Sequence, residues 1–140
     1  MSYLWVTIGS ALGGLLRYAI TRLTLTYSIG FPFGTILINV LGSFVIGYFG
    51  TLTLQNGRFP ASDNLRLFVM VGICGGFTTF SSFSLQTFDL MRSGAWARAL
   101  ANVLLSVVLC LAAVAAGHIL AQRSNPAQAI AEAAQEKYTG

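Results

Sequence analysis

The sequence predicts an all-α integral membrane protein with four transmembrane helices. Of its 140 residues, 55% are hydrophobic and only 9% are charged, and the mean hydropathy is +0.72. A soluble domain carries about 25% charged residues, so the composition favours the membrane class. Four apolar runs each reach the length of about 20 residues that a spanning helix requires. The three prolines lie between or after these runs, as expected of helix-breaking residues: Pro32, Pro60 and Pro126.

The basic residues are dispersed along the chain and mostly flank the apolar runs. They are Arg17, Arg22, Arg58, Arg66, Arg92, Arg98, Arg123 and Lys137. This distribution is typical of membrane-helix ends rather than of a basic patch, so the pI near 9.5 does not indicate nucleic-acid binding. We expect a multi-pass protein of the plasma (inner) membrane. Residues 1–123 are expected to form one transmembrane domain, followed by a polar tail over residues 124–140.

The first apolar run extends from about Tyr3 to Leu25. Gly9 and Gly13 lie four residues apart, a spacing that allows another helix to approach closely. Arg17 is unusual inside such a run. It either reaches the membrane interface or serves as a buried cation that holds carbonyl groups or a partner helix. Its position within about two turns of the end of the run favours the structural role.

The second run, from about Phe33 to Leu54, carries a polar stripe. Its members recur at every fourth position and therefore share one helix face: Thr35, Asn39, Ser43 and Gly47. An unpaired amide in hydrocarbon is costly, so Asn39 must find a partner. The sequence leaves two roles for Asn39 equally open, a clamp between helices and a hydrogen-bond donor in a pore.

The third run, from about Leu65 to Met91, contains the most unusual stretch of the chain. Gly75 and Gly76 lower the helix propensity. Hydroxyl and aromatic side chains follow them at Thr78, Thr79, Phe80, Ser81, Ser82 and Phe83. We expect the helix to be broken over Gly75–Thr79. Because broken backbone at membrane depth is tolerated only beside protein or a water-filled cavity, this stretch is predicted to line a permeation path.

The fourth run, from about Trp96 to Ala121, has a second polar stripe. Asn102, Ser106 and Cys110 lie four residues apart on one helix face. The two cysteines, Cys74 and Cys110, are both inside apolar runs and are expected to be free thiols rather than a disulfide or a metal site. The tail beyond the fourth run is assigned no role.

Four spans place both chain termini on one side of the membrane. That side would hold Arg58, Arg66, Arg123 and Lys137. The other side would hold Arg22, Arg92 and Arg98, together with Arg17 if it reaches the interface. The positive-inside rule therefore gives almost no bias. A chain without bias can insert in both orientations, and this predicts a dual-topology antiparallel homodimer whose broken helices meet near the midplane.

The polar stripes offer hydrogen-bond donors and few charges. Asp89 is the acidic residue nearest to the stripes, and it sits near the end of a run. A cation pore favours carboxylate or carbonyl rings, whereas amides, hydroxyls and the positive edges of aromatic rings suit a small anion. The alternative is a small dual-topology proton-coupled cation or drug exporter, which needs a buried acidic residue. A third class is a non-transporting assembly protein, and an enzyme is least expected because no nucleophile–base or metal constellation is present.

Three motifs resemble the Fluc (CrcB) family of fluoride channels. They are GGLLRY at residues 13–18, GTILINVLGSF at residues 34–44 and GGFTTFSSF at residues 75–83. The last motif is highly specific, and the order and spacing of all three agree with the family. The resemblance covers residues 4–121, and the tail lies outside it.

The resemblance implies a fluoride-selective channel that passively exports cytoplasmic fluoride and works as an antiparallel homodimer with two pores. It implies a fluoride pathway whose residues include the phenylalanines Phe80 and Phe83, the amide of Asn39 and hydroxyl positions on several helices: Thr35, Ser81, Ser82 and Ser106. Asn102 is added to this pathway from the stripe on the fourth run, where it and Cys110 stand at positions that hold Tyr and Ser in some members. A structural Na⁺ at the dimer centre would be held by the main-chain carbonyls of Gly75 and Thr78.

Overall fold

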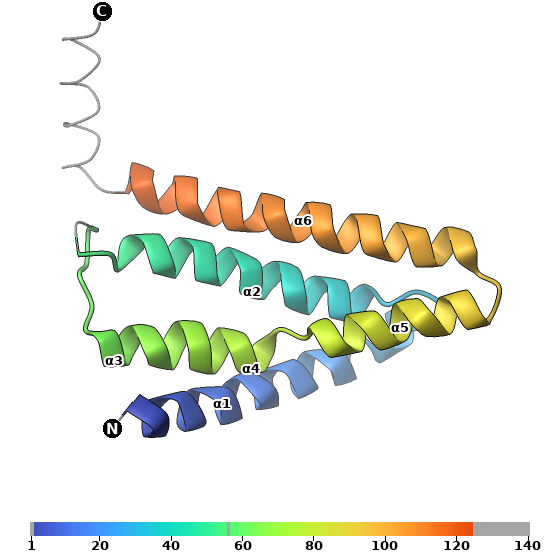
Figure 1. Cartoon of the computed structure of the whole chain (residues 1–140), viewed down its shortest axis with the longest axis horizontal. Helices are drawn as coiled ribbons and strands as arrows, with labels where there is room; N and C mark the ends of the chain where they lie inside the picture. The colour runs from blue at the N-terminus through green and yellow to red at the C-terminus, as the bar shows by residue number, and fades with distance from the viewer. Residues whose placement is uncertain (1, 56, 125–140) are drawn as a thin grey trace, which may run out of the picture.

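The computed structural model describes residues 2–55 and 57–124, so the predicted tail lies outside the described residues except for Ser124. The elements follow in the order α1 (Ser2–Leu23), η1 (Leu25–Ser28), α2 (Phe33–Leu52), α3 (Asp63–Arg66), η2 (Leu67–Cys74), α4 (Gly75–Phe77), α5 (Phe80–Arg92) and α6 (Trp96–Arg123). Elements α3 to α5 together form the third of four helical spans that are long and apolar enough to cross a membrane. The predicted four-helix membrane architecture is therefore confirmed. α1 begins and α6 ends on the same side of the bundle (Figure 1).

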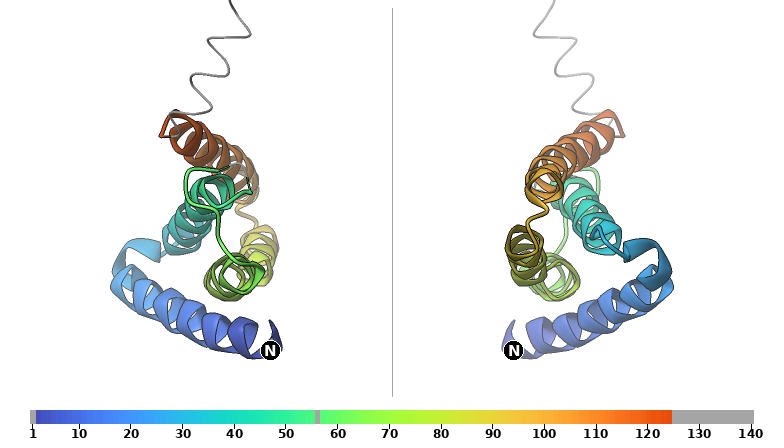
Figure 2. Two further views of the ribbon diagram at one scale, coloured as in Figure 1. Left: turned by 90° about the vertical axis from the view of Figure 1, so that its left-hand side faces the viewer. Right: turned by 90° about the vertical axis from the view of Figure 1, so that its right-hand side faces the viewer.

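The third span changes its packing partner halfway along its length. Its first half, η2 and α4, packs mainly against α1, whereas its second half, α5, packs mainly against α6. α2 lies between the third span and α6, and its most extensive contact is with α6 (Figures 1 and 2). A straight helix could not follow both neighbours, so the interruption within the third span lets one chain segment serve two sides of the bundle.

The interruption is shorter than the sequence predicts. Helical structure continues through Gly75, Gly76 and Phe77, and only Thr78 and Thr79 are extended, with ψ angles of 157° and 105°. The expected break over Gly75–Thr79 is therefore wrong in its first three residues. Another feature that no sequence pattern indicated is the π-helix η2, Leu67–Cys74, which directly precedes α4. π-helical turns are rare and usually short.

Gly72 and Gly76 of the third span serve close packing rather than the break, whereas a Cβ atom on Gly75 would meet nothing within 4 Å. A Cβ atom on Gly72 would lie 2.8 Å from the Cα atom of Gly9, and one on Gly76 would lie 2.9 Å from the Cα atom of Ser10. Gly9 and Gly13, which predicted a close helix approach, therefore have their counterpart in Gly72 and Gly76. Two pairs of glycines with the same four-residue spacing bring the backbones of α1 and the third span into contact.

Arginines near the span ends hold backbone carbonyls. Arg66 donates from Nη1 to the Gly50 carbonyl at 3.0 Å and to Thr53 Oγ1 at 2.6 Å. Arg98 Nη1 donates to the Gly30 carbonyl at 2.9 Å. The role that the sequence suggested for Arg17, a cation holding carbonyl groups, is thus filled by other arginines. No hydrogen bond from the Arg17 guanidinium is present among the described residues, and its structural role stays a prediction.

The outer surface of the bundle is strongly apolar. Large hydrophobic side chains are exposed on every span, including Leu15 on α1, Leu41 on α2, Val71 on η2 and Leu111 on α6. A soluble protein would bury such side chains, whereas hydrocarbon solvates them at no cost. The exposure identifies the surface as one that faces lipid or further protein.

Adjacent glycines on α1 provide a matched test of the close packing. A Cβ atom on Gly13 would collide with the Ile73 carbonyl and lie 2.8 Å from the Phe77 nitrogen, whereas one on Gly14 meets nothing within 4 Å. We expect Gly13→Ala to lower the free energy of unfolding by about 1–3 kcal/mol through overpacking. Gly14→Ala should leave it unchanged or raise it by up to about 1 kcal/mol, because alanine is the better helix former. Reversible unfolding in mixed micelles, followed by circular dichroism, measures both, and equal effects would contradict the packing role.

Candidate ion pathway

The interruption in the third span is held open by one side chain. Asn39 of α2 donates from Nδ2 to the Thr79 carbonyl at 3.2 Å, and its Oδ1 accepts from the Thr79 N–H at 2.8 Å. Both main-chain groups of Thr79 are therefore satisfied by a residue 40 positions away in sequence. The amide carries two N–H donors, so a second donor is left beyond the bond to Thr79. Asn39 can clamp two spans and still offer a donor to a ligand.

The interruption also leaves two carbonyl groups without their usual helical hydrogen-bond donors. In a continuous helix the Gly75 carbonyl would accept from the Thr79 N–H, and the Thr78 carbonyl would accept from the Ser82 N–H. The first of these donors bonds to Asn39 Oδ1, and the second bonds to Thr79 Oγ1 at 3.2 Å. Gly75 is exposed, so its carbonyl is not enclosed by this chain.

Thr79 also starts the second half of the span. Its Oγ1 accepts from the Ser82 N–H as an N-cap, and the same hydroxyl group donates to Ser82 Oγ at 2.9 Å. Thr79 Oγ1 lies 3.3 Å from Ser81 Oγ. A threonine is among the preferred N-cap residues because its oxygen satisfies an amide that has no helical partner. Ser81 and Ser82 are thus gathered at the start of α5.

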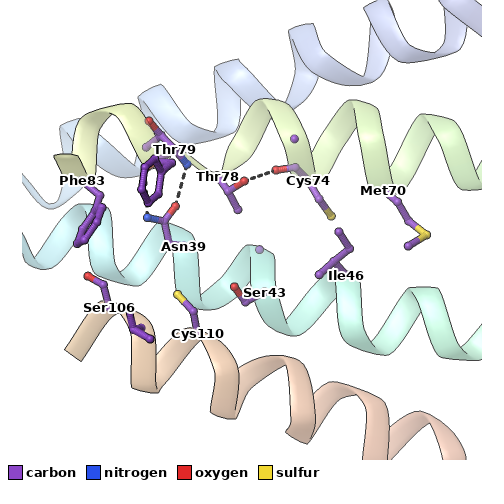
Figure 3. A pocket seen from close by; sticks show the side chains of 14 residues that line it. Asn39, Ser43, Ile46, Met70, Cys74, Thr78, Thr79, Phe83, Ser106 and Cys110 are labelled. Carbon is purple, nitrogen blue, oxygen red and sulfur yellow. Dashed lines mark hydrogen bonds between the residues drawn. The ribbon is translucent and has the colours of Figure 1, made fainter. Parts of the chain in front are cut away.

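A cavity of about 400 Å³ opens beside the interruption and is lined by α2, the third span and α6. Figure 3 shows the polar side chains that face it: Asn39, Ser43, Thr78, Thr79, Ser106 and Cys110. Phe80 and Phe83 line it as well, with ring centroids 5.4 Å apart and an interplanar angle of 45°. None of its lining residues is acidic or basic. The cavity therefore offers a few uncharged donors and two aromatic rings in a lining that is otherwise largely apolar, with Ile46, Met70 and Val107.

The structure brings together some of the predicted pathway residues and separates others. Asn39, Phe80, Phe83 and Ser106 share the cavity, together with Gly75 and Thr78. Thr35 lies on a different cavity of about 400 Å³ that η1 and the C-terminal end of α1 help to line. Asn102 lines neither cavity and is only 1% exposed.

Two lining residues carry roles that the sequence reading did not assign. Thr79 is the acceptor and donor for Asn39 and the N-cap of α5, and Cys110 exposes part of its thiol to the cavity. The available signal for Thr79 was a threonine placed just before a helix-forming segment, which is the pattern of an N-cap. For Cys110 the signal was its place in the stripe with Asn102 and Ser106.

Known proteins match this chain over nearly the whole of its membrane domain. The family model described as CrcB-like protein, Camphor Resistance (CrcB), matches residues 4–118. A protein of Methylobacterium radiotolerans named a fluoride-specific ion channel is 65% identical over 120 residues, covering 86% of this chain and 84% of that protein. Proteins with the same name from Gluconobacter oxydans and Methylocella silvestris are 59% and 58% identical, covering 94% and 89% of this chain and 93% and 96% of their own lengths.

Proposed function

This chain belongs to the CrcB family, and on that premise we propose that it is a fluoride-specific ion channel. It is a multi-pass membrane protein and not an enzyme. The relatives that match it over more than four fifths of both chains carry the name of fluoride channels. They do not support the alternative of a proton-coupled cation or drug exporter.

The observation that carries this function is the donor-lined cavity at the interruption. Fluoride is small and strongly hydrated, so a pore must replace its water with closely spaced donors. The second N–H of Asn39 would supply one such donor, and the hydroxyl of Ser106 would supply another once it leaves its long 3.4 Å bond to Asn102 Oδ1. The rings of Phe80 and Phe83 also line the cavity, and a ring edge turned toward an anion would meet it with partial positive charge. Because the lining is uncharged, an anion is attracted without being trapped by a fixed cation, which conduction requires.

Passive export follows from the chemistry of hydrogen fluoride. In an acidic medium fluoride enters a cell as neutral HF, which dissociates at the higher internal pH and is trapped as the anion. A channel that passes only the anion lets it leave down its gradient, and no coupled proton is needed. No carboxylate lines the cavity, as such coupling would require.

The working unit is proposed to be a dual-topology antiparallel homodimer. Phe80 is 79% exposed, and the cavity that it lines is open at the surface of the single chain. An ion cannot cross hydrocarbon beside an open wall, so a second copy would have to close it. Arginines hold carbonyls at both ends of the bundle, Arg58 and Arg66 at one end and Arg98 at the other. Counted over all described span ends, Arg58, Arg66 and Arg123 stand at one end and Arg22, Arg92 and Arg98 at the other, and this balance removes the charge bias that would select one orientation.

A structural Na⁺ is proposed at the centre of that dimer. The carbonyls of Gly75 and Thr78 have lost their helical donors, and oxygen atoms of this kind are ligands that a hard cation prefers. The donor set fits the ion, although two carbonyls are too few for a complete coordination shell, and an antiparallel partner would bring two more. When bound, the ion would supply positive charge that holds the two broken spans together.

The phenylalanines provide the direct test of the pathway. In liposomes loaded with potassium fluoride and opened with a potassium ionophore, a fluoride electrode should record rapid efflux from the wild-type protein. Phe80→Ile and Phe83→Ile should each nearly abolish it, because an aliphatic side chain has no positive edge. Phe88→Ile is a matched control, since Phe88 is an exposed α5 residue that does not line the cavity. Retained efflux in the two cavity variants, with unchanged size-exclusion profiles, would overturn the ring-edge role.

The dual topology has its own test. A single cysteine introduced at Ser93, in a background without Cys74 and Cys110, should react with a membrane-impermeant maleimide from both faces of the membrane. About half of the protein should be labelled from each side, because the charge bias is close to zero. Labelling from one side alone would contradict the antiparallel dimer and leave fluoride conduction itself untouched.

Removal of Na⁺ tests the cation site. Prolonged dialysis against N-methylglucamine should lower the fluoride efflux rate or the melting temperature of the dimer, and added Na⁺ should restore it. Added Mg²⁺ should not, because it holds its own water tightly and demands near-octahedral geometry. Full activity and stability after dialysis to trace Na⁺ levels would contradict the site.

A further inference from the structure

We infer that Asn102 is a positioning residue of the channel, which sets the two cavity walls formed by Phe83 and Ser106 at a fixed separation. The inference rests on the proposed fluoride conduction. It gives Asn102 a role behind the wall of the cavity instead of contact with the ion.

A buried chain of hydrogen bonds joins α5 to α6 at this point. Asn102 Nδ2 donates to Thr87 Oγ1 at 2.8 Å, and the Thr87 hydroxyl donates to the Phe83 carbonyl at 2.7 Å. On the other side, Ser106 Oγ donates to Asn102 Oδ1 at 3.4 Å. Phe83 and Ser106 line the cavity, whereas Asn102 and Thr87 are 1% and 7% exposed. The series of hydrogen bonds therefore begins at Phe83 and ends at Ser106, which both line the cavity, and it passes behind the cavity wall.

The bonding pattern determines the orientation of the Asn102 amide. The single hydroxyl hydrogen of Thr87 is directed to the Phe83 carbonyl, so Thr87 Oγ1 is left to act as an acceptor. The amide group beside it must then be the NH₂ donor, which turns Oδ1 toward Ser106. Exchanging the two ends of the amide would set two acceptors against each other at Thr87, a costly arrangement in a buried site.

The interruption of the third span explains why α5 needs this support. Helical hydrogen bonds do not cross Thr78 and Thr79, so α4 does not hold α5 rigidly in place. Among the described residues, side-chain hydrogen bonds tie this segment to other spans at two places: Asn39 at the N-terminal end of α5, and Asn102 two turns farther along, at Thr87. Phe83 lies between these anchors, so its position relative to α6 depends on both.

The longest hydrogen bond of this series, from Ser106 to Asn102, is the one that an ion in the cavity would compete for. The 3.4 Å separation between Ser106 Oγ and Asn102 Oδ1 is long for a hydroxyl donor. A hydrogen bond to an anion is roughly twice as strong as one between neutral groups. The Ser106 hydroxyl can therefore turn from the neutral amide oxygen to fluoride in the cavity, while the stronger bond to Thr87 keeps Asn102 in place.

Three variants test the positioning role by single-channel fluoride current in planar bilayers. Asn102→Leu removes the amide at similar volume, Thr87→Val removes its acceptor at nearly constant shape, and the double variant removes both. Each single change should lower the current of the open channel by about fivefold, the rate equivalent of one interhelical hydrogen bond in a membrane. The double variant should fall no further, because both changes break the same link. A purely structural role would change the melting temperature or the number of channels but not the current through each.

Ser84→Ala is the matched control. Ser84 donates to the Phe80 carbonyl at 2.9 Å, as Thr87 does to Phe83, but it is exposed and has no recorded hydrogen bond to α6. Its channel current should equal that of the wild type. Wild-type currents in both Asn102→Leu and Thr87→Val would overturn the positioning role alone, whereas a wild-type protein without fluoride current would overturn the proposed function and this inference with it. If Asn102→Leu does not fold, as judged by size exclusion, Thr87→Val decides the outcome.

Discussion

Asn39 supplies Thr79 with the two hydrogen bonds that an uninterrupted helix would have supplied from within. Leaving a peptide group unpaired in hydrocarbon is costly, so a transmembrane helix stops only where another part of the protein provides the missing partners. The carboxamide does so with one acceptor and one donor, at 2.8 Å and 3.2 Å. Once Thr79 is held in this way, its hydroxyl can cap α5, and the third span can leave α1 and continue along α6.

That change of partner creates the cavity. α1 and the first half of the third span meet through backbone contacts at Gly9 and Gly72, which leave no room for a side chain at that point. The second half diverges toward α6, and the space between α2, α6 and the interruption is lined by a few short polar side chains, two phenylalanines and several aliphatic side chains. Close packing on one side of the bundle and an open cavity on the other are two consequences of one interruption.

In the proposed pathway, the cavity would solvate an anion with neutral groups rather than neutralise its charge. Its polar groups are an amide, hydroxyls and aromatic rings, and Arg66 and Arg98 lie near the span ends, where they hold backbone carbonyls. Neutral donors release an ion more readily than a salt bridge would, which suits conduction. The proposed dimer would add the second wall, and the proposed cation would add one positive charge where the Gly75 and Thr78 carbonyls lack donors.

Some features follow from local properties of the chain, namely hydropathy, proline positions and four-residue spacings. These properties were sufficient to predict the four spans, the close helix approach at Gly9 and Gly13, and the polar stripe that contains Asn39. The resemblance in residues 75–83 pointed to the function and to Phe80, Phe83 and Ser106 as neighbours. Tertiary structure decided the position of the break. Gly75, Gly76 and Phe77 remain helical, and the helix stops after Phe77 because Asn39, 40 residues away in sequence, holds the main chain of Thr79. It also placed Asn102 behind the cavity wall, since the side of α6 that α5 covers depends on where the third span turns, and no local pattern records that direction.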